Sequence, residues 1–386
     1  MKKTNYIQTV LSNLLYEMDT PLDTYKTFKY NFFIWRLLGL FPNEKNKHLY
    51  YLYCTFINIT VTIYYPVSLV VILFLVTKIE VLMEIMSLNL AVLVCSLKAF
   101  NILFMRKQIV KVKDYTSILD ARATDPEEEQ LLRGVIKLCR KYFIFYCFLY
   151  GGGAVSAEIT FLFSSERKLL YTAWFPFVDW INDDTAFYII HVYQIFGLCF
   201  LITQNLADDT LPTFYMCVLC GHVKALSLRI RKLGSNPAKT EEQHYEDLIG
   251  CVNDHKTILE YCRLVQNVLS VVILLQFLTS GVTMCITAVY ALFVSENLFK
   301  IIYTTVFFTC MIMEITLPCY YGNQLMDTTS QLTTSLYNCN WVDRNQKFKK
   351  ALIIFMSKTQ ISNGIYAGKF IEVSLSTFLG VGNQDL

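Results

Sequence analysis

The sequence predicts an all-α membrane protein with seven transmembrane helices and a cytoplasmic N-terminus. Of its 386 residues, 54% are apolar and 17% are charged, whereas soluble domains average about 45–50% and about 25%. The apolar residues form blocks of about twenty or more, the length that crosses a bilayer. These features argue against a soluble enzyme, and a net charge of +3 is too small to indicate nucleic-acid binding. No catalytic or cofactor motif stands out, so we expect neither an enzyme nor a bound cofactor.

Seven apolar blocks are long enough to cross about 30 Å of hydrocarbon. The first is the clearest, because residues 50–76 contain no charge, whereas the second and the seventh blocks contain charged residues. The predicted spans are residues 49–76, 80–104, 142–164, 186–204, 266–293, 300–325 and 351–379.

The basic residues predict which helix ends face the cytoplasm. Of the 34 Lys and Arg residues, 27 lie in segments 1–48, 105–141, 205–265 and 326–350, and 4 lie in the other three connections. The positive-inside rule places the four basic segments in the cytoplasm. The N-terminus is then inside and the C-terminus outside, which is the opposite of a G-protein-coupled receptor.

This topology divides the chain into three parts. Residues 1–48 form a cytoplasmic N-terminal segment, residues 49–325 contain the first six helices, and residues 326–386 contain a cytoplasmic connection and the last helix. Segment 205–265 has helical periodicity that runs into the fifth span. We therefore expect helices four and five to extend below the membrane as a cytoplasmic bundle suited to subunit assembly.

Charged residues inside the predicted spans are candidates for function, because charge is costly in lipid. Lys98 lies near the cytoplasmic end of the second span, where it can extend to the interface, and Glu158 and Glu314 lie deeper in the third and sixth. Each glutamate either makes an interhelical hydrogen bond or faces a wet cavity. The pair Cys217-x-x-Cys220 lacks a second pair of ligands, so we expect no metal site.

The outer halves of four spans combine adaptable apolar side chains with weakly polar ones, which suits a small, mostly apolar ligand held by one or two hydrogen bonds. Ordinary packing between helices is the alternative for each position. The candidate lining residues are Met83, Met86, Ser87, Gly153, Ser156, Thr160, Tyr188, His191, Ile195, Tyr303 and Phe307.

The outer connection over residues 165–185 is unusually aromatic. It contains Trp174, Phe175, Phe177 and Trp180, with Pro176 among them. Such residues form either an interfacial aromatic belt or a lid over an outward-facing cavity. The two interpretations are compatible.

Several C-terminal residues match a known family signature: Cys319, Gly322, Ser330, Tyr337, Trp341, Lys358 and Gln360. In this pattern the sequence resembles the insect odorant receptors. Residues 364–378 resemble the start of that family's last helix, and residues 174–194 resemble its outer stretch. The resemblance covers about residues 20–379.

The resemblance implies a volatile-gated cation channel of the plasma membrane of olfactory neurons. It implies a tetramer, usually a tuning receptor with a shared co-receptor, and an odorant pocket among the outer halves of spans two to six. The long insertion of the co-receptor is absent from segment 205–265, so the chain resembles a tuning subunit. By this resemblance, Tyr337, Trp341, Lys358 and Gln360 belong to the cytoplasmic subunit anchor, and Val373, Ser376 and Thr377 to the pore helix.

The C-terminus departs from the family pattern. The family's last helix continues beyond the position of Phe378, whereas this chain ends Gly-Val-Gly-Asn-Gln-Asp-Leu. We hypothesise an alternative transcript or a retained intron beginning near Val381, which several independent transcripts with this same ending would contradict. The alternatives are a gustatory receptor of the same superfamily, a non-conducting isoform that silences its partners, and a transporter, for which no inverted repeat is found.

Overall fold

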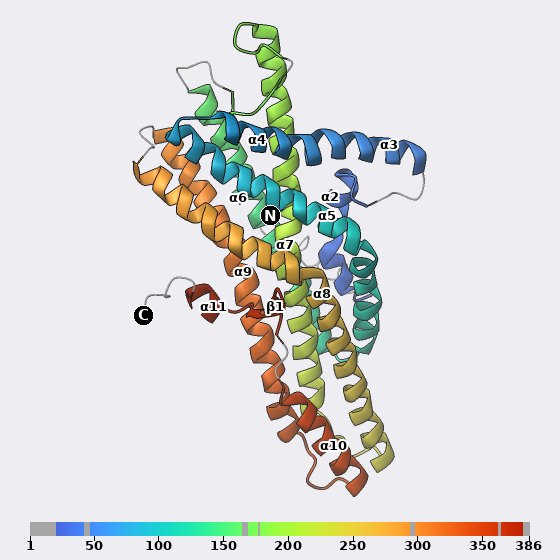
Figure 1. Cartoon of the computed structure of the whole chain (residues 1–386). Coiled ribbons are helices and arrows are strands. Elements are labelled where there is room, and N and C mark those ends of the chain that lie inside the picture. The colour runs from blue at the N-terminus through green and yellow to red at the C-terminus, as the bar shows by residue number, and fades with distance from the viewer. Residues whose placement is uncertain are drawn as a thin grey trace, which may run out of the picture.

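The computed structural model describes residues 21–41, 47–163, 169–176, 178–293, 298–361 and 364–380. Nearly all of these residues are helical. In chain order the elements are η1 (Thr24–Phe28), α2 (Lys29–Leu37), α3 (Lys47–Ile57), the π-helix η2 (Asn58–Ile63), α4 (Tyr64–Leu75), α5 (Ile79–Arg122), α6 (Pro126–Leu162), α7 (Asp184–Arg231), α8 (Glu241–Phe293), α9 (Leu298–Tyr337), α10 (Gln346–Thr359), β1 (Tyr366–Ala367), β2 (Ile371–Glu372) and α11 (Leu375–Gly380). Helix α7 runs along one elongated body, while α3 and α4 lie across its upper part (Figure 1).

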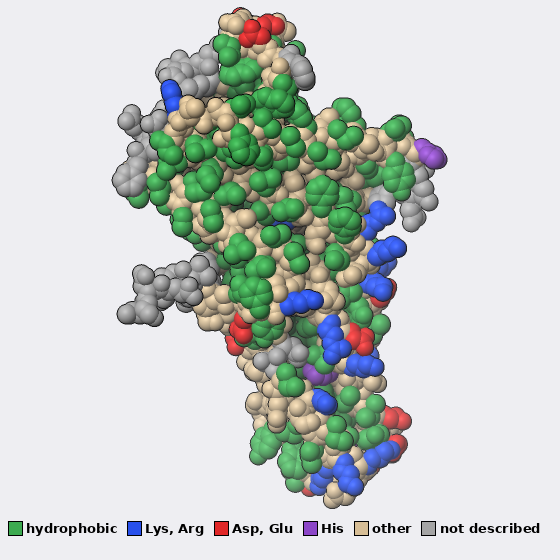
Figure 2. Space-filling view, viewed as in Figure 1, with side chains coloured by type: hydrophobic (Ala, Val, Ile, Leu, Met, Phe, Trp, Pro, Cys, Tyr) green, Lys and Arg blue, Asp and Glu red, His purple; other side chains and the backbone are tan. Residues whose placement is uncertain are grey.

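Within the described ranges, six helices are long and apolar enough to cross a membrane, and each covers all or nearly all of one of the first six predicted spans. The first consists of α3, η2 and α4 joined end to end, and the other five are α5 to α9. Hydrophobic side chains cover the upper half of the molecule, and Lys and Arg gather lower down (Figure 2). The chain is therefore a multi-pass, all-α membrane protein.

The seventh predicted helix, over residues 351–379, is wrong as a continuous helix. α10 ends at Thr359, and β1 and β2 then form an antiparallel hairpin before the short α11. The turn contains two consecutive left-handed residues, Gly368 at φ 61° and Lys369 at φ 69°, which a right-handed helix cannot include. Apolar side chains of this segment are instead buried by packing against neighbouring helices.

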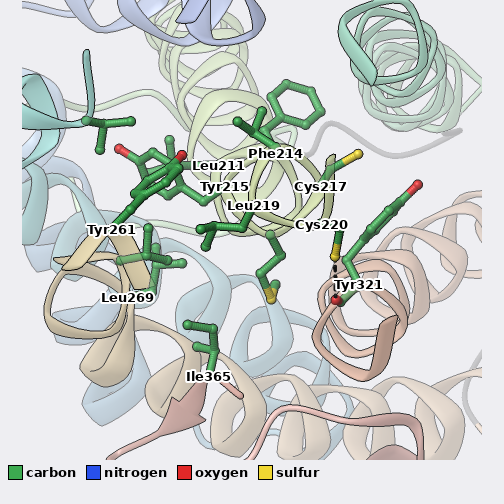
Figure 3. Close-up of a cluster of buried hydrophobic side chains, with 14 of the residues drawn as sticks. Leu211, Phe214, Tyr215, Cys217, Leu219, Cys220, Tyr261, Leu269, Tyr321 and Ile365 are labelled. Carbon is green, nitrogen blue, oxygen red and sulfur yellow. Dashed lines mark hydrogen bonds between the residues drawn. The ribbon is translucent and has the colours of Figure 1, made fainter. Parts of the chain in front are cut away.

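α7 is the central helix of the fold. Every residue from Leu206 to Val223 is buried, and α2, α5, α6, α8 and α9 all contact this helix. Figure 3 shows its side chains reaching Tyr261 of α8 and Tyr321 of α9. The Cys220 thiol donates to the Tyr321 carbonyl oxygen at 3.8 Å. A helix covered on all sides has no solvent-facing side, which explains why this part of the sequence lacks an amphipathic stripe; its buried polar groups, such as Asp208 and Asp209, bond to neighbouring helices.

The predicted cytoplasmic extensions of helices four and five are present, since α7 continues to Arg231 and α8 begins at Glu241. Figure 1 shows them running with α9 to the foot of the molecule, beside α10. Arg229 of α7 connects four helices there. Its guanidinium group forms ion pairs with Glu128 of α6 and Asp254 of α8, and donates to the Arg122 carbonyl of α5 at 2.8 Å. Outside this bundle core, Lys232 hydrogen-bonds Asp125 and lowers the pKa of its carboxyl group.

The segment before the first span packs against α7. The fully buried indole of Trp35 donates to Asp208 at 2.8 Å, and the side chain of Asn31 donates to the Ala207 carbonyl at 2.6 Å. α2 thus occupies part of the surface of α7 and completes its burial.

The C-terminal hairpin is held by α8 and α9. The Gln266 side chain makes hydrogen bonds of 2.7 and 2.6 Å to the backbone N–H and carbonyl of Tyr366, and Gly368 N–H donates to the Ser270 carbonyl at 2.8 Å. On the other side, Gly322 of α9 lies so close to the Val373 carbonyl that a Cβ would overlap it. The hairpin therefore depends on a glycine in a neighbouring helix.

Gly322→Ala should displace the hairpin and lower stability by about 1–3 kcal/mol, the usual cost of overpacking. Gly281→Ala in α8 is the matched control, because its Cβ meets nothing within 4 Å and alanine favours a helix by up to about 1 kcal/mol. Melting of the detergent-solubilised protein, followed by fluorescence-detected size exclusion, measures both. Equal melting temperatures for the two variants would contradict the packing argument.

Candidate functional site

Two adjoining chambers lie between α5, α6, α7, α8 and α9, in the half of the bundle closed by the outer connections. The outer chamber has a volume of about 210 Å³ and the inner chamber about 100 Å³. They meet along one wall, because five residues line both: Leu88, Ala157, Leu198, Tyr303 and Phe307. The two chambers are therefore neighbours across these residues, and we refer to the pair as the divided cavity.

Polar groups make up much of the outer chamber's wall. The hydroxyl group of Thr287 donates to Ser87 at 3.3 Å, and the ammonium group of Lys300 donates to the Tyr290 hydroxyl at 3.4 Å. The other residues that line only this chamber are Val81, Met83, Ile85, Thr160, Phe161, Leu169, Leu170, Tyr171, Thr172 and Thr304. This chamber can hydrogen-bond a polar group of a ligand.

The inner chamber is mainly apolar. Its own lining includes Ala91, Val92, Gly153, Leu201, Ile202, Cys310 and Met311. Its polar groups are Tyr150, Asn205 and Asp209, and the Tyr150 hydroxyl donates to Asp209 at 2.7 Å. The inner chamber therefore offers mainly carbon surface.

Six of the predicted lining residues lie on the chamber walls. Met83, Ser87 and Thr160 line the outer chamber, Gly153 lines the inner chamber, and Tyr303 and Phe307 line both. They come from α5, α6 and α9.

The other five predicted residues line neither chamber. Tyr188 and Met86 are at the surface, with 66% and 38% exposed. His191 lies 3.2 Å from Glu158 and stacks on Phe161 with ring centroids 3.9 Å apart. The remaining two are Ser156, whose hydroxyl bonds its own helix, and the half-buried Ile195.

On α7 the predicted face is the one that meets the cavity, but the predicted depth is too shallow. The spacing of Tyr188, His191 and Ile195 continues through Leu198, Ile202 and Asn205, which do line the chambers. α7 rises beyond its neighbours at the outer side (Figure 1). Counting from its outer end therefore places the site too near the surface.

The resemblance implied that the fifth span contributes to the pocket, but no lining residue of α8 was predicted. Thr287 and Tyr290 line the outer chamber, and with the buried Thr283 they recur at i, i+4 and i+7, which is one face of a helix. That spacing of hydroxyl groups in an apolar span was the signal available in the sequence.

A buried ion cluster lies directly beneath the inner chamber. Lys98 of α5 is 4% exposed and forms ion pairs with Asp209 of α7 and with Glu314 of α9, the latter at 2.8 Å. The prediction that Lys98 extends to the interface is therefore wrong, because two carboxylates of neighbouring helices hold it inside the bundle. Glu314 makes the interhelical bond that one of its two interpretations anticipated.

The outer connection closes the cavity with residues other than the predicted tryptophans. Leu169, Leu170, Tyr171 and Thr172 line the outer chamber, whereas Trp174 and Trp180 do not. Tyr171 is anchored by a hydrogen bond to Tyr65, and its carbonyl accepts from Gln194 at 2.8 Å. Phe177 lies outside the described residues.

Comparisons with known proteins agree on one family. The family model described as "7tm Odorant receptor" matches residues 78–383. Odorant receptor 2a of Drosophila melanogaster is 32% identical over 375 residues, with 93% of this chain and 94% of the relative covered. Odorant receptor 33b of the same species is 33% identical over 358 residues, with 92% of each covered.

Solved structures show the same fold. The insect olfactory receptor OR5 from Machilis hrabei superimposes with a TM-score of 0.80 at 16% identity, covering 93% of this chain and 95% of that one. The same receptor solved in complex with eugenol gives a TM-score of 0.79 at 16% identity, with the same coverage.

Lys98→Met should destabilise the protein by about 3–5 kcal/mol, because it leaves Asp209 and Glu314 buried without their cation. Adding Glu314→Gln should recover part of the loss. Lys232→Met is the control, since its ion pairs lie at the solvent-exposed end of the bundle and contribute little. The melting temperature of the solubilised protein tests this prediction. A Lys98 variant that melts no lower than the Lys232 variant would refute it.

Proposed function

The chain belongs to the insect odorant receptor family, and we propose that it is a tuning subunit that forms a volatile-gated cation channel with an odorant co-receptor. The observation that carries this proposal is the divided cavity in the outer half of the bundle. Its enclosure by five helices and its mixture of carbon surface with a few polar groups suit a small, mainly apolar molecule.

We propose that the six predicted residues on the chamber walls contact the odorant: Met83, Ser87, Gly153, Thr160, Tyr303 and Phe307. The relative solved with eugenol supports a volatile as the ligand class. Binding opens the channel only to the extent that the odorant prefers the open arrangement of these helices over the closed one.

The subunit anchor is proposed at the foot of the molecule. Tyr337 is exposed, the Trp341 indole donates to the Tyr337 carbonyl at 3.0 Å, and Lys358 and Gln360 lie on the surface. Nearby, Ile353 and Ile354 of α10 are 66% and 63% exposed. Adjacent exposed isoleucines at the end of a polar bundle suit contact with another subunit.

The pore is proposed to lie beside α11. Ser376 and Thr377 belong to this helix, and both hydrogen-bond Ser374, at 2.7 and 3.2 Å. Val373 precedes α11 and is buried against α9, so it serves to hold the helix rather than to face ions.

Co-expression with a co-receptor in cells should produce an odorant-dependent cation current that the co-receptor alone does not give. Whole-cell recording with a panel of volatiles measures it, after surface labelling has established delivery to the plasma membrane. A chain that reaches the surface and adds no response would contradict the proposed channel role and favour a silent subunit.

Replacing both Ile353 and Ile354 with Glu should weaken co-assembly about a hundredfold or more, because each buried isoleucine contributes about 1.5–3 kcal/mol. Lys350→Glu on the same helix is the matched surface control. Co-purification of the co-receptor with a tagged chain reports assembly. If the double variant still retains the co-receptor fully, α10 is not the contact.

A further inference from the structure

We propose that the divided cavity selects straight-chain molecules with a hydrogen-bond-accepting oxygen at one end, the oxygen in the outer chamber and the alkyl chain in the inner chamber. This inference rests on the proposed odorant-binding function and specifies its ligand class. It follows from the different chemistry of the two chambers and from their shared wall.

Ser87 is the donor that recognises the oxygen. Its hydroxyl oxygen accepts from Thr287 at 3.3 Å, so its own hydrogen points elsewhere, and no acceptor takes it among the described residues. Ser87 is buried on α5 and lines the outer chamber. A carbonyl or ether oxygen placed there satisfies a donor that is otherwise left without a partner.

The inner chamber accepts the chain. Its walls are carbon and sulfur over most of their area, and its Tyr150 and Asp209 groups already bond each other. An oxygen atom inserted there loses its hydrogen bonds to water and gains few in return, apart from those that Asn205 and the shared Tyr303 can offer. The reversed orientation is therefore disfavoured.

A glycine leaves space in the wall of this chamber. Gly153 of α6 lines it, and a Cβ at this position meets only Val306, at 3.9 Å, so a side chain can start there without a clash and reduces the space left for a ligand. The neighbouring Gly152 is exposed, lines neither chamber and has nothing within 4 Å of a Cβ. The two positions form a matched pair on one helix.

The test is ligand-induced thermal stabilisation of the purified full chain, which reports binding without requiring a current. The probes are straight-chain methyl ketones of increasing length and alkanes of the same lengths. For the wild-type protein, affinity for ketones should rise about fourfold per methylene group until the inner chamber is full. For Gly153→Leu, the affinity should stop rising at a shorter chain length. For Gly152→Leu, the affinity should depend on chain length as it does for the wild-type protein.

Ser87→Ala should lower ketone affinity about fivefold, toward that of the matching alkane, as expected for one hydrogen bond. Ser156→Ala, whose hydroxyl bonds its own helix, should change nothing. The inference is overturned if no ketone stabilises the protein, if Gly152→Leu and Gly153→Leu give the same length profile, or if Asn205→Leu removes the ketone preference and Ser87→Ala does not. Binding without current would leave this inference intact and count against the channel role alone.

Discussion

The ion cluster of Lys98, Asp209 and Glu314 is the constraint on which the rest of the bundle depends. Three charged groups from three helices are buried together, and removing each from water costs several kcal/mol unless the others remain in contact. The helices α5, α7 and α9 can therefore slide or rotate only slightly without exposing an unpaired charge. Two prolines lie at the same level. Pro212 removes the helical hydrogen bond of the Asp208 carbonyl, and Pro318 removes that of the Glu314 carbonyl. Asp208 and Asp209 both find partners on other helices, Trp35 and Lys98.

Much of this architecture can be predicted from the sequence, because the hydrocarbon core of a membrane restricts the length and charge of the helices that cross it. Spans of about twenty apolar residues suffice to place six helices, and the alternation of basic connections predicts their direction. The site is only half predictable for a geometric reason. Helical spacing gives the correct face of α7, but the depth of a cavity depends on how far each helix rises. Tyr188 is exposed, and His191 packs against Glu158 and Phe161 of α6. Lys98 misleads for a similar reason, since a lysine near a helix end looks free to reach water until its partners on other helices are known.

The hairpin after α10 is the clearest case of tertiary structure overriding local sequence. Its residues are apolar enough to be taken for a membrane helix, and nothing local except the glycines argues otherwise. What holds the hairpin is remote: Gln266 pairs with its first strand like another strand, and Gly322 leaves room for the Val373 carbonyl. These contacts join residues about a hundred and about fifty positions apart, beyond the reach of any periodicity argument. The segment that leads into α11 is thereby fastened to α8 and α9, the same helices that line the cavity.

Cavity and ion cluster share Asp209, and this continuity gives a ligand a means of acting on the bundle. Tyr150 and Asp209 line the inner chamber, and Asp209 also binds Lys98. A molecule that fills the inner chamber therefore touches the groups that tie α5, α6, α7 and α9 together, whereas one confined to the outer chamber does not. Packed interiors respond to such contact by moving between discrete arrangements rather than by deforming gradually. Occupancy of the inner chamber, and not affinity alone, is then the property that separates a ligand able to shift the helices from one that only binds.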